Sequence, residues 1–304
     1  MSHETGAHAP KELTIGVIGG SGLYAMEGLT DVTFMELETP FGRPSDAFVI
    51  GRLAGRRMVF LPRHGRAHRV LPHDINFRAN LWGMKKLGVT QLLSVSAVGS
   101  MKEDIRPGDL VLVDQFIDLT KRRPSTFFGD GTVVHVPMAH PVSEPMRREL
   151  VKVAKDHSIR AHDGGTYVCI EGPQFSTKAE SMVYRSWGVS VIGMTNMPEA
   201  KLAREAEISY ATIALATDYD CWHEEEASVS VDAVLAVLSA NVERAKSVVK
   251  AYAERATAEL HTKEISRVLD TSLMTPMEAI PETARSALSP ILDPVFARKQ
   301  KEAE

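Results

Sequence analysis

The stretch of residues 189–222 constrains the fold of this chain more than any other part of the sequence. Two apolar runs, 189–194 and 208–216, flank a segment in which Pro198 suits the first turn of a helix. The second run is apolar almost throughout, which is typical of a parallel strand covered on both faces. The pattern predicts two buried strands joined by one helix, as in an open α/β sheet.

Polar side chains follow both predicted strands. Met194 and Thr195 end the first, and Asp218 and Asp220 come directly after the second. Open α/β sheets bind their ligands in the crevice outside the carboxyl ends of the strands. We therefore expect these four side chains to face one pocket.

Composition narrows the class of partner. The chain has 304 residues, of which 44% are hydrophobic, so it can bury a large core. Its net charge is −4, and its Lys and Arg residues are spread along the chain, unlike the basic patch of a nucleic-acid binder. We therefore expect small-molecule partners and no nucleic acid.

Cysteine content and hydropathy indicate the compartment. Cys169 and Cys221 give no disulfide framework, which indicates a reducing environment. Residues 1–10 lack the apolar segment of a secretion signal, and no later apolar run is long enough to span a bilayer. We expect a cytoplasmic protein with no membrane partner.

A glycine-rich turn follows the first predicted strand, residues 13–18. The run Gly19-Gly20-Ser21-Gly22 would let backbone N–H groups and the Ser21 hydroxyl approach an anion closely. It has neither the full spacing of a dinucleotide fingerprint nor the Lys of a nucleoside-triphosphate loop. An anion site and a plain tight turn both fit this run.

A basic loop follows the strand predicted at residues 57–61. It contains Arg63, His64, Arg66, His68 and Arg69, and guanidinium groups offer forked donors to a phosphate or a carboxylate. His64 and His68 have the spacing of a zinc-binding pair on a helix, but Gly65 indicates a loop and no third ligand is evident. We therefore predict no metal site, and a solvated loop remains the alternative for Arg66 and Arg69.

Two more strand ends carry candidate binding residues. The strand predicted at 91–95 ends in Ser96-Ala97-Val98-Gly99-Ser100, where small residues would let a ligand lie against the backbone. The strand predicted at 165–170 leads into Glu171 and Phe175. There Glu171 could accept hydrogen bonds from a polar ring stacked on Phe175, while core packing is the alternative for the aromatic side chain.

The remaining sequence gives the domain organisation. Residues 1–12 are predicted to form a disordered tail, 13–262 one domain, and 263–304 a partly helical C-terminal extension that packs on the body or on a neighbour. Asp74 is predicted to cap the helix that ends before Gly88. The long irregular segment 115–141 is of the kind that carries function or an interface.

Taken together, the ordered motifs resemble those of a known family. They are Gly19-Gly20-Ser21-Gly22, Arg63-His64-Gly65-Arg66, Ser96-Ala97-Val98-Gly99-Ser100, Glu171-Gly172-Pro173-Gln174-Phe175, Met194-Thr195-Asn196-Met197-Pro198-Glu199 and Ala216-Thr217-Asp218-Tyr219-Asp220. This set resembles the trimeric purine nucleoside phosphorylase family, and within it the members that act on S-methyl-5'-thioadenosine. The resemblance covers residues 13–260, and its specificity lies in the order of the motifs.

The resemblance implies an α/β fold, a single domain with a mixed, twisted central β-sheet flanked by helices. It implies a pentosyltransferase that releases adenine and 5-methylthioribose 1-phosphate, with inorganic phosphate as co-substrate and no metal or organic cofactor. It assigns phosphate binding to Ser21, Arg63, His64, Ser96, Ala97 and Thr195. It places Met194 under the ribose, stacks Phe175 on the purine, and directs Asp218 and Asp220, the catalytic residues, to N6 and N7 of the base.

The same resemblance makes two further assignments. Val231, Val234 and Leu235 would line the pocket for the methylthio group, since residues three and four apart share a helical face. His135, in the long irregular segment, would reach a neighbouring subunit's site, which implies a homo-oligomer, a trimer or a hexamer.

The sequence departs from the family pattern at a few positions, and two alternatives stay open. Ser96 stands where some relatives have Thr, and Asn196-Met197 replaces a Thr-Val pair. One alternative is a phosphorylase of 6-oxopurine nucleosides or methylthioinosine, which an amide at position 218 would serve better than Asp218. The other is a non-catalytic nucleoside-binding protein, and the presence of Arg63 and His64 argues against it.

Overall fold

Strand β11 (Ser209–Asp218) lies in the middle of the sheet and is buried at nine of its ten residues. Its side chains alternate between two cores. Ile213 and Leu215 pack with one apolar cluster, while Tyr210 and Ala214 pack with another on the opposite face. The prediction of a strand covered on both faces is therefore confirmed.

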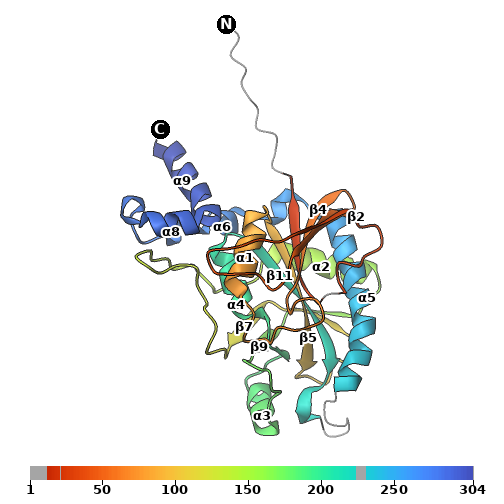
Figure 1. Cartoon of the computed structure of the whole chain (residues 1–304). Coiled ribbons are helices and arrows are strands. Elements are labelled where there is room, and N and C mark those ends of the chain that lie inside the picture. The colour runs from red at the N-terminus through yellow and green to blue at the C-terminus, as the bar shows by residue number, and fades with distance from the viewer. Residues whose placement is uncertain (1–11, 21, 224–230, 304) are drawn as a thin grey trace.

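The computed structural model describes residues 12–20, 22–223 and 231–303. Within these residues, one mixed, twisted sheet passes between two layers of helices, with α1 and α4 on one face and α2 and α5 on the other (Figure 1). The other strands are β1 (Thr14–Gly19), β2 (Thr30–Met35), β3 (Phe48–Leu53), β4 (Arg56–Pro62), β5 (Gln91–Ser100), β6 (Leu110–Leu112), β7 (Gln115–Asp118), β8 (Ala161–Asp163), β9 (Thr166–Cys169) and β10 (Val191–Gly193). Their order is β2-β3-β4-β1-β5-β10-β9-β7, with β11 paired to β5 and β6, and β6 to β8.

The helices follow the strands in chain order. They are α1 (Phe77–Lys86), α2 (Glu144–Asp156), α3 (Lys178–Ser186), α4 (Asn196–Glu205), α5 (Val231–Arg255), α6 (Lys263–Ser266), α7 (Val268–Ser272), α8 (Glu282–Ala287) and α9 (Ser289–Ala303). Single 3₁₀ turns are η1 (Asp220–Trp222), η2 (Ala258–Leu260) and η3 (Met277–Ala279). No helix within the described ranges has the length and apolar character needed to cross a bilayer.

The predicted cap of helix α1 is wrong. The N-cap is Asn76, whose side chain accepts a hydrogen bond from the backbone N–H of Ala79 at 3.1 Å. Asp74 lies two residues too early, in a turn in which its N–H donates to the carbonyl of Leu71. The Asn76 amide also donates to the carbonyl of Phe41, so the cap residue holds a neighbouring loop as well.

Strand β5 connects the parts of the sheet, because it pairs with β1, β10 and β11. The sequence predicted that it ends at Val95, but it continues to Ser100 because β11 pairs with it along its whole length. On its other edge, β5 pairs in parallel with β1 up to Ser94 and antiparallel with β10 only from Gly99. Residues 95–98 therefore face a gap between β1 and β10, where the pairing changes direction.

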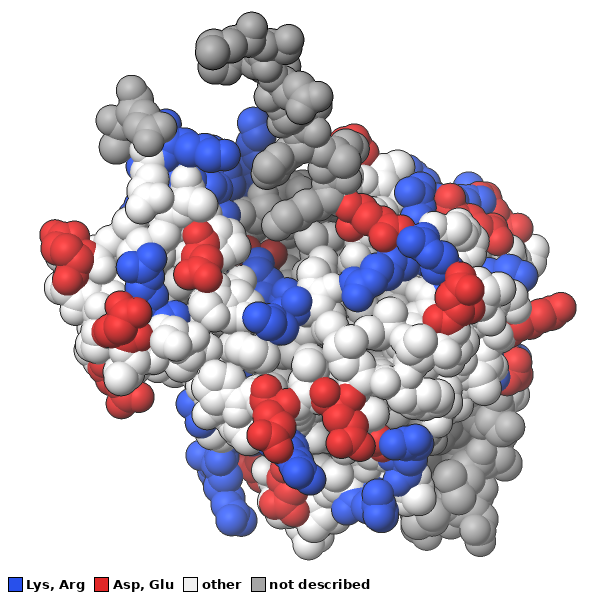
Figure 2. Space-filling model, turned by 45° about the horizontal axis from the view of Figure 1, so that its top comes forward, with Lys and Arg blue, Asp and Glu red and all other residues white. Residues whose placement is uncertain are grey.

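The C-terminal extension packs against the body beside α1 and α4 (Figure 1). Leu269 and Ile291 join the apolar core on that face, and the indole N–H of Trp82 donates to the carbonyl of Ala287 at 2.9 Å. Arg298 joins the extension to the body, because its guanidinium donates to both Glu207 and Asp270. On the face drawn in Figure 2, side chains of both charge signs are interspersed.

Candidate active site

The gap beside residues 95–98 of β5 opens into a pocket. The residues that line it include nine that the sequence singled out, and these are Arg63, His64, Ser96, Ala97, Phe175, Met194, Thr195, Asp218 and Asp220. The expectation that Met194, Thr195, Asp218 and Asp220 face one pocket is therefore confirmed. Because β10 pairs antiparallel with Gly99 and Ser100 at the carboxyl end of β5, the chain leaves β10 in the direction of residues 95–98.

Arg63 comes from the end of β4 and is only 2% exposed. Its guanidinium forms a buried ion pair with Glu199 of α4, with Nε 2.9 Å from Oε2. Nη2 donates to Ser94, and Nη1 donates to the carbonyl of Val95 at 3.0 Å. An arginine has five N–H donors, so among the described residues Nη1 keeps one hydrogen for a ligand.

His64 has a defined tautomer. Its Nδ1 lies 2.8 Å from the carbonyl oxygen of Val70, and a carbonyl only accepts, so Nδ1 carries hydrogen. Burial, and after it the nearby charge of Arg63, lowers the pKa of His64 from 6.5 to about 4. The imidazole is therefore neutral near pH 7, with Nε2 as its acceptor.

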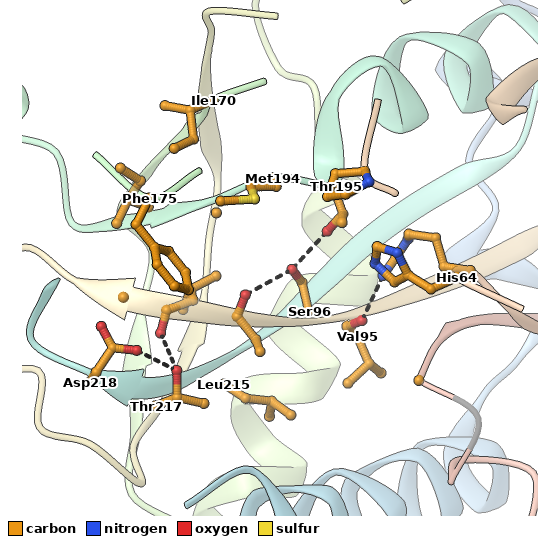
Figure 3. Close-up of a pocket in the computed structure, with 18 of the residues that line it drawn as sticks. His64, Val95, Ser96, Ile170, Phe175, Met194, Thr195, Leu215, Thr217 and Asp218 are labelled. Carbon is orange, nitrogen blue, oxygen red and sulfur yellow. Dashed lines mark hydrogen bonds between the residues drawn. The ribbon is translucent and has the colours of Figure 1, made fainter. Parts of the chain in front are cut away.

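Hydroxyl and backbone groups complete this end of the pocket. Ser96 Oγ lies 2.9 Å from Thr195 Oγ1, and Figure 3 shows the two hydroxyls joined between His64 and Met194. Val95 and Ala97 are two apart on a strand, so their backbone groups point to the same edge. Because the Val95 carbonyl faces the gap and accepts from Arg63, the Ala97 N–H faces the gap too.

The opposite end of the pocket holds an aromatic ring and two carboxyls. Phe175 is 57% exposed and its ring lies near Asp218, with Met194 between the ring and Thr195 (Figure 3). Core packing, the alternative for Phe175, is therefore wrong. Gly99 allows the Asp218 carboxyl to approach the backbone of β5, because a Cβ at position 99 would lie 3.0 Å from Asp218 Oδ1.

Both carboxyl groups accept hydrogen bonds from the protein, and both are shielded from solvent. Asp218 accepts from the Thr217 hydroxyl at 2.7 Å and from the Asp220 N–H at 2.8 Å. Asp220 accepts from the Ser181 hydroxyl. Burial is the largest cause of a raised pKa for each aspartate, and the negative charge of Asp218 adds to the rise at Asp220.

Glu171 does not have the function that the sequence suggested. Its carboxylate accepts from the backbone N–H groups of Lys121 and Arg122 and from the guanidinium of Arg123, with Nε 2.9 Å from Oε1. Glu171 is also absent from the residues that line the pocket. Its donors come from the long segment before α2, so Glu171 fixes that segment and lies outside the pocket.

Three residues near the pocket were missed by sequence reasoning. Ser176 lines the pocket and its buried hydroxyl has no partner among the described residues. Ser181 contacts Asp220, and Tyr167 contacts the hydroxyl of Ser96 and the backbone N–H of Thr195. Ser176 could have been found, since it directly follows Phe175, but the other two lie within a helix and a strand with no motif around them.

Four predicted residues cannot be placed by their side chains. Ser21 lies outside the described residues, and so do the side chains of Val231, Val234 and Leu235, whose backbone belongs to α5. His135 is exposed and does not line this pocket; its N–H donates to the carbonyl of Ser272 at 3.0 Å. In the described parts of the chain, no group of three or more His, Cys, Asp or Glu side chains is arranged to hold a metal.

Comparison with known proteins defines the class. The sequence model of the phosphorylase superfamily matches residues 14–254. The S-methyl-5'-thioadenosine phosphorylase of Geobacter sulfurreducens is 57% identical over 92% of this chain and 98% of its own, and that of Koribacter versatilis is 53% identical over 94% and 98%. The chain belongs to the phosphorylase superfamily and, within it, to the S-methyl-5'-thioadenosine phosphorylases.

Solved structures agree with this assignment. A methylthioadenosine phosphorylase from an antarctic soil metagenomic library superimposes with a TM-score of 0.86 at 46% identity, covering 93% of this chain and 100% of its own. The methylthioadenosine phosphorylase of Schistosoma mansoni, solved in complex with adenine, gives 0.82 at 36% identity, covering 86% and 99%. The predicted fold, a mixed sheet flanked by helices, is confirmed.

Proposed function

We propose that the chain catalyses the phosphorolysis of S-methyl-5'-thioadenosine, giving adenine and 5-methylthioribose 1-phosphate. One observation carries the proposal: a single pocket has donors for an anion at one end and two carboxyls of raised pKa at the other. The similarity to relatives that carry the name of this activity supports it.

Phosphate is the nucleophile in this proposal. A phosphate oxygen forms a bond to the ribose carbon as the bond from that carbon to the purine nitrogen breaks, so positive charge develops on the sugar. The free N–H of Arg63, the hydroxyls of Ser96 and Thr195 and the Ala97 N–H would hold the phosphate beneath the ribose, with His64 Nε2 accepting from a P–OH group. Ser21 would contribute a further hydroxyl.

The leaving base takes up the electrons of the broken bond, and a proton at N7 relieves that charge. Both oxygens of Asp218 accept from donors, which favours its ionised form and suits acceptance from the N6 amino group. The charge of Asp218 in turn raises the pKa of Asp220, beyond the rise that burial causes. We therefore assign the proton at N7 to Asp220 and the recognition of N6 to Asp218.

Other side chains would contact the purine ring, the ribose and the methylthio group of the substrate. Phe175 would stack on the purine and Met194 would lie under the ribose, in the order in which Figure 3 shows them along the pocket. Val231, Val234 and Leu235 would cover the methylthio group. An ionised Asp218 repels the O6 atom of a 6-oxopurine, which argues against a phosphorylase for inosine-type nucleosides.

Assembly, cofactors and compartment are also proposals. We infer a homo-oligomer, a trimer or a hexamer, in which His135 reaches a neighbour's pocket. The exposure of His135 in the long irregular segment 115–141 supports this. Phosphate is a co-substrate, and the mechanism above uses no metal or organic cofactor. The two free cysteines, Cys169 and Cys221, support a reducing cytoplasm.

One assay tests the function. Base release from a panel of nucleosides is measured with and without phosphate, and titration calorimetry with methylthioadenosine reports binding. We expect adenine release that requires phosphate. Equal release in phosphate-free buffer would indicate a hydrolase, and binding without release a non-catalytic protein.

A further inference from the structure

Tyr167 lies directly behind the anion end of the pocket. It belongs to β9, its side chain is fully buried, and it is absent from the residues that line the pocket. Its hydroxyl oxygen is 3.3 Å from Ser96 Oγ and 3.4 Å from the backbone nitrogen of Thr195. Tyr167 thus contacts both of the residues whose hydroxyls would bind phosphate, and it contacts them from the side away from the ligand.

The hydrogen bonds of this hydroxyl can be assigned a direction. The Thr195 N–H donates to it, whereas either member of the Tyr167–Ser96 pair could donate to the other. Because the Ser96 hydroxyl has an acceptor of its own in the Ala97 carbonyl, we assign the phenolic hydrogen to the bond with Ser96 Oγ. Burial raises the pKa of Tyr167 to about 12, so the phenol keeps that hydrogen throughout the working range of an enzyme. Ser96 accepts from Tyr167, and its own hydrogen is therefore directed away from the tyrosine.

The direction matters because the ionised oxygens of phosphate can accept hydrogen bonds but cannot donate them. With Tyr167 as donor, Ser96 is left to donate, either to the ligand or to Thr195 Oγ1 at 2.9 Å, which then donates to the ligand. The Ser96 hydroxyl donates to the carbonyl of Ala97 at 3.3 Å, which is consistent with this direction.

Packing does not account for the hydroxyl. The ring of Tyr167 packs on that of Phe116 with centroids 5.7 Å apart, a contact that a phenylalanine would also make. The hydroxyl instead excludes any side chain at position 193, since a Cβ there would lie 2.0 Å from the Tyr167 oxygen. Gly193 has no positive φ that would require glycine, so the close approach of this oxygen explains the residue.

We infer that Tyr167 is a positioning residue for phosphate, acting through Ser96 and Thr195 by fixing the direction in which their hydroxyls donate. The inference rests on the proposed function. It assigns a specific part of phosphate recognition to a residue that the substrate does not touch. Loss of the hydroxyl should weaken phosphate binding and leave nucleoside binding nearly unchanged.

The test is Tyr167→Phe, which removes one oxygen and keeps the ring. We expect the KM for phosphate to rise by about three- to tenfold, the value of one ordinary hydrogen bond, while the KM for methylthioadenosine changes by less than about twofold. Tyr252→Phe is the matched control. Tyr252 is equally buried, and its hydroxyl donates to Gln91 at 2.8 Å, outside the pocket.

A double-substitution cycle adds a second readout. In a Ser96→Ala background, Tyr167→Phe should have a smaller effect on phosphate than in the wild type, because its partner is gone. An unchanged KM for phosphate, an equal rise for both substrates, or a Tyr167→Phe chain that does not fold would each overturn the inference. If the wild type releases base without phosphate, the proposed function itself fails, which is a different result.

Discussion

The Ser181 hydroxyl oxygen lies 2.5 Å from Asp220 Oδ2, and both side chains are buried. The bond joins α3 to η1, the 3₁₀ turn that carries the proposed acid. Burial raises the pKa of Asp220, whereas this hydrogen bond lowers it, because a donor stabilises the ionised carboxyl. Ser181 therefore stabilises the carboxylate that remains once Asp220 has given its proton to the base.

Ser181→Ala should change the pH profile and the rate in opposite senses. Without the donor, the pKa of Asp220 rises, so the alkaline limb of kcat/KM moves to higher pH. The maximal kcat should fall by roughly tenfold or more, since a hydrogen bond to a charged group is worth about 1.5–3 kcal/mol. Ser186→Ala, on the same helix but exposed, is the control. A lower rate with an unmoved limb would leave Ser181 a purely structural residue.

Asp218→Asn should change the choice of base. An amide can donate to O6, whereas the carboxylate accepts from N6–H, so activity on adenine nucleosides should fall and relative activity on inosine-type nucleosides should rise. Rates on methylthioadenosine and methylthioinosine under equal phosphate measure the ratio. If that ratio does not change, Asp220 becomes the candidate for base selection.

The 5' end of the ribose gives a third prediction. A wall formed by Val231, Val234 and Leu235 would leave the 5'-hydroxyl of adenosine without a partner, at a cost of about 1–3 kcal/mol. We expect a preference of roughly ten- to a few hundred-fold in kcat/KM for methylthioadenosine over adenosine. Val234→Ser should narrow it. Equal use of both nucleosides by the wild type would contradict this assignment.

The free energy of unfolding should decrease as pH falls, because two partly buried histidines have lowered pKa values in the folded chain. Burial lowers the pKa of His64 and of His261 from 6.5 to about 4. Between these values the unfolded chain binds more protons, so the free energy of unfolding decreases as pH falls from 6.5 to 4, by about 3 kcal/mol for each histidine. His64→Gln and His261→Gln should each reduce the slope by one proton in denaturant titrations.

The fifth prediction concerns assembly. If His135 completes a neighbour's pocket, the active species is an oligomer, and dilution that produces monomers should abolish activity. Light scattering at the assay concentration identifies the species present. A fully active monomer would exclude the role given to His135.

Local motifs predicted much of the site, because the pocket draws on short runs at or near the ends of strands. The path of β5 beyond Val95 was not predictable, since its continuation depends on pairing with β11, which is more than a hundred residues away. The ion pair between Arg63 and Glu199 of α4 was not predictable either, because the local sequence presents Arg63 only as a donor for a ligand. Arg63→Ala would leave that carboxylate buried and uncompensated, so loss of folding would obscure any effect on phosphate.

The ion pair of Arg63 with Glu199 also bears on how the anion is recognised. With the guanidinium neutralised by its partner and His64 uncharged, this end of the pocket offers phosphate hydrogen bonds but little net positive charge. Selection among anions then depends on the geometry of the donors, and ionic strength should have little influence on it. The charge of the bound phosphate is left largely uncompensated until the sugar becomes cationic, so the strongest attraction arises in the transition state and not on binding.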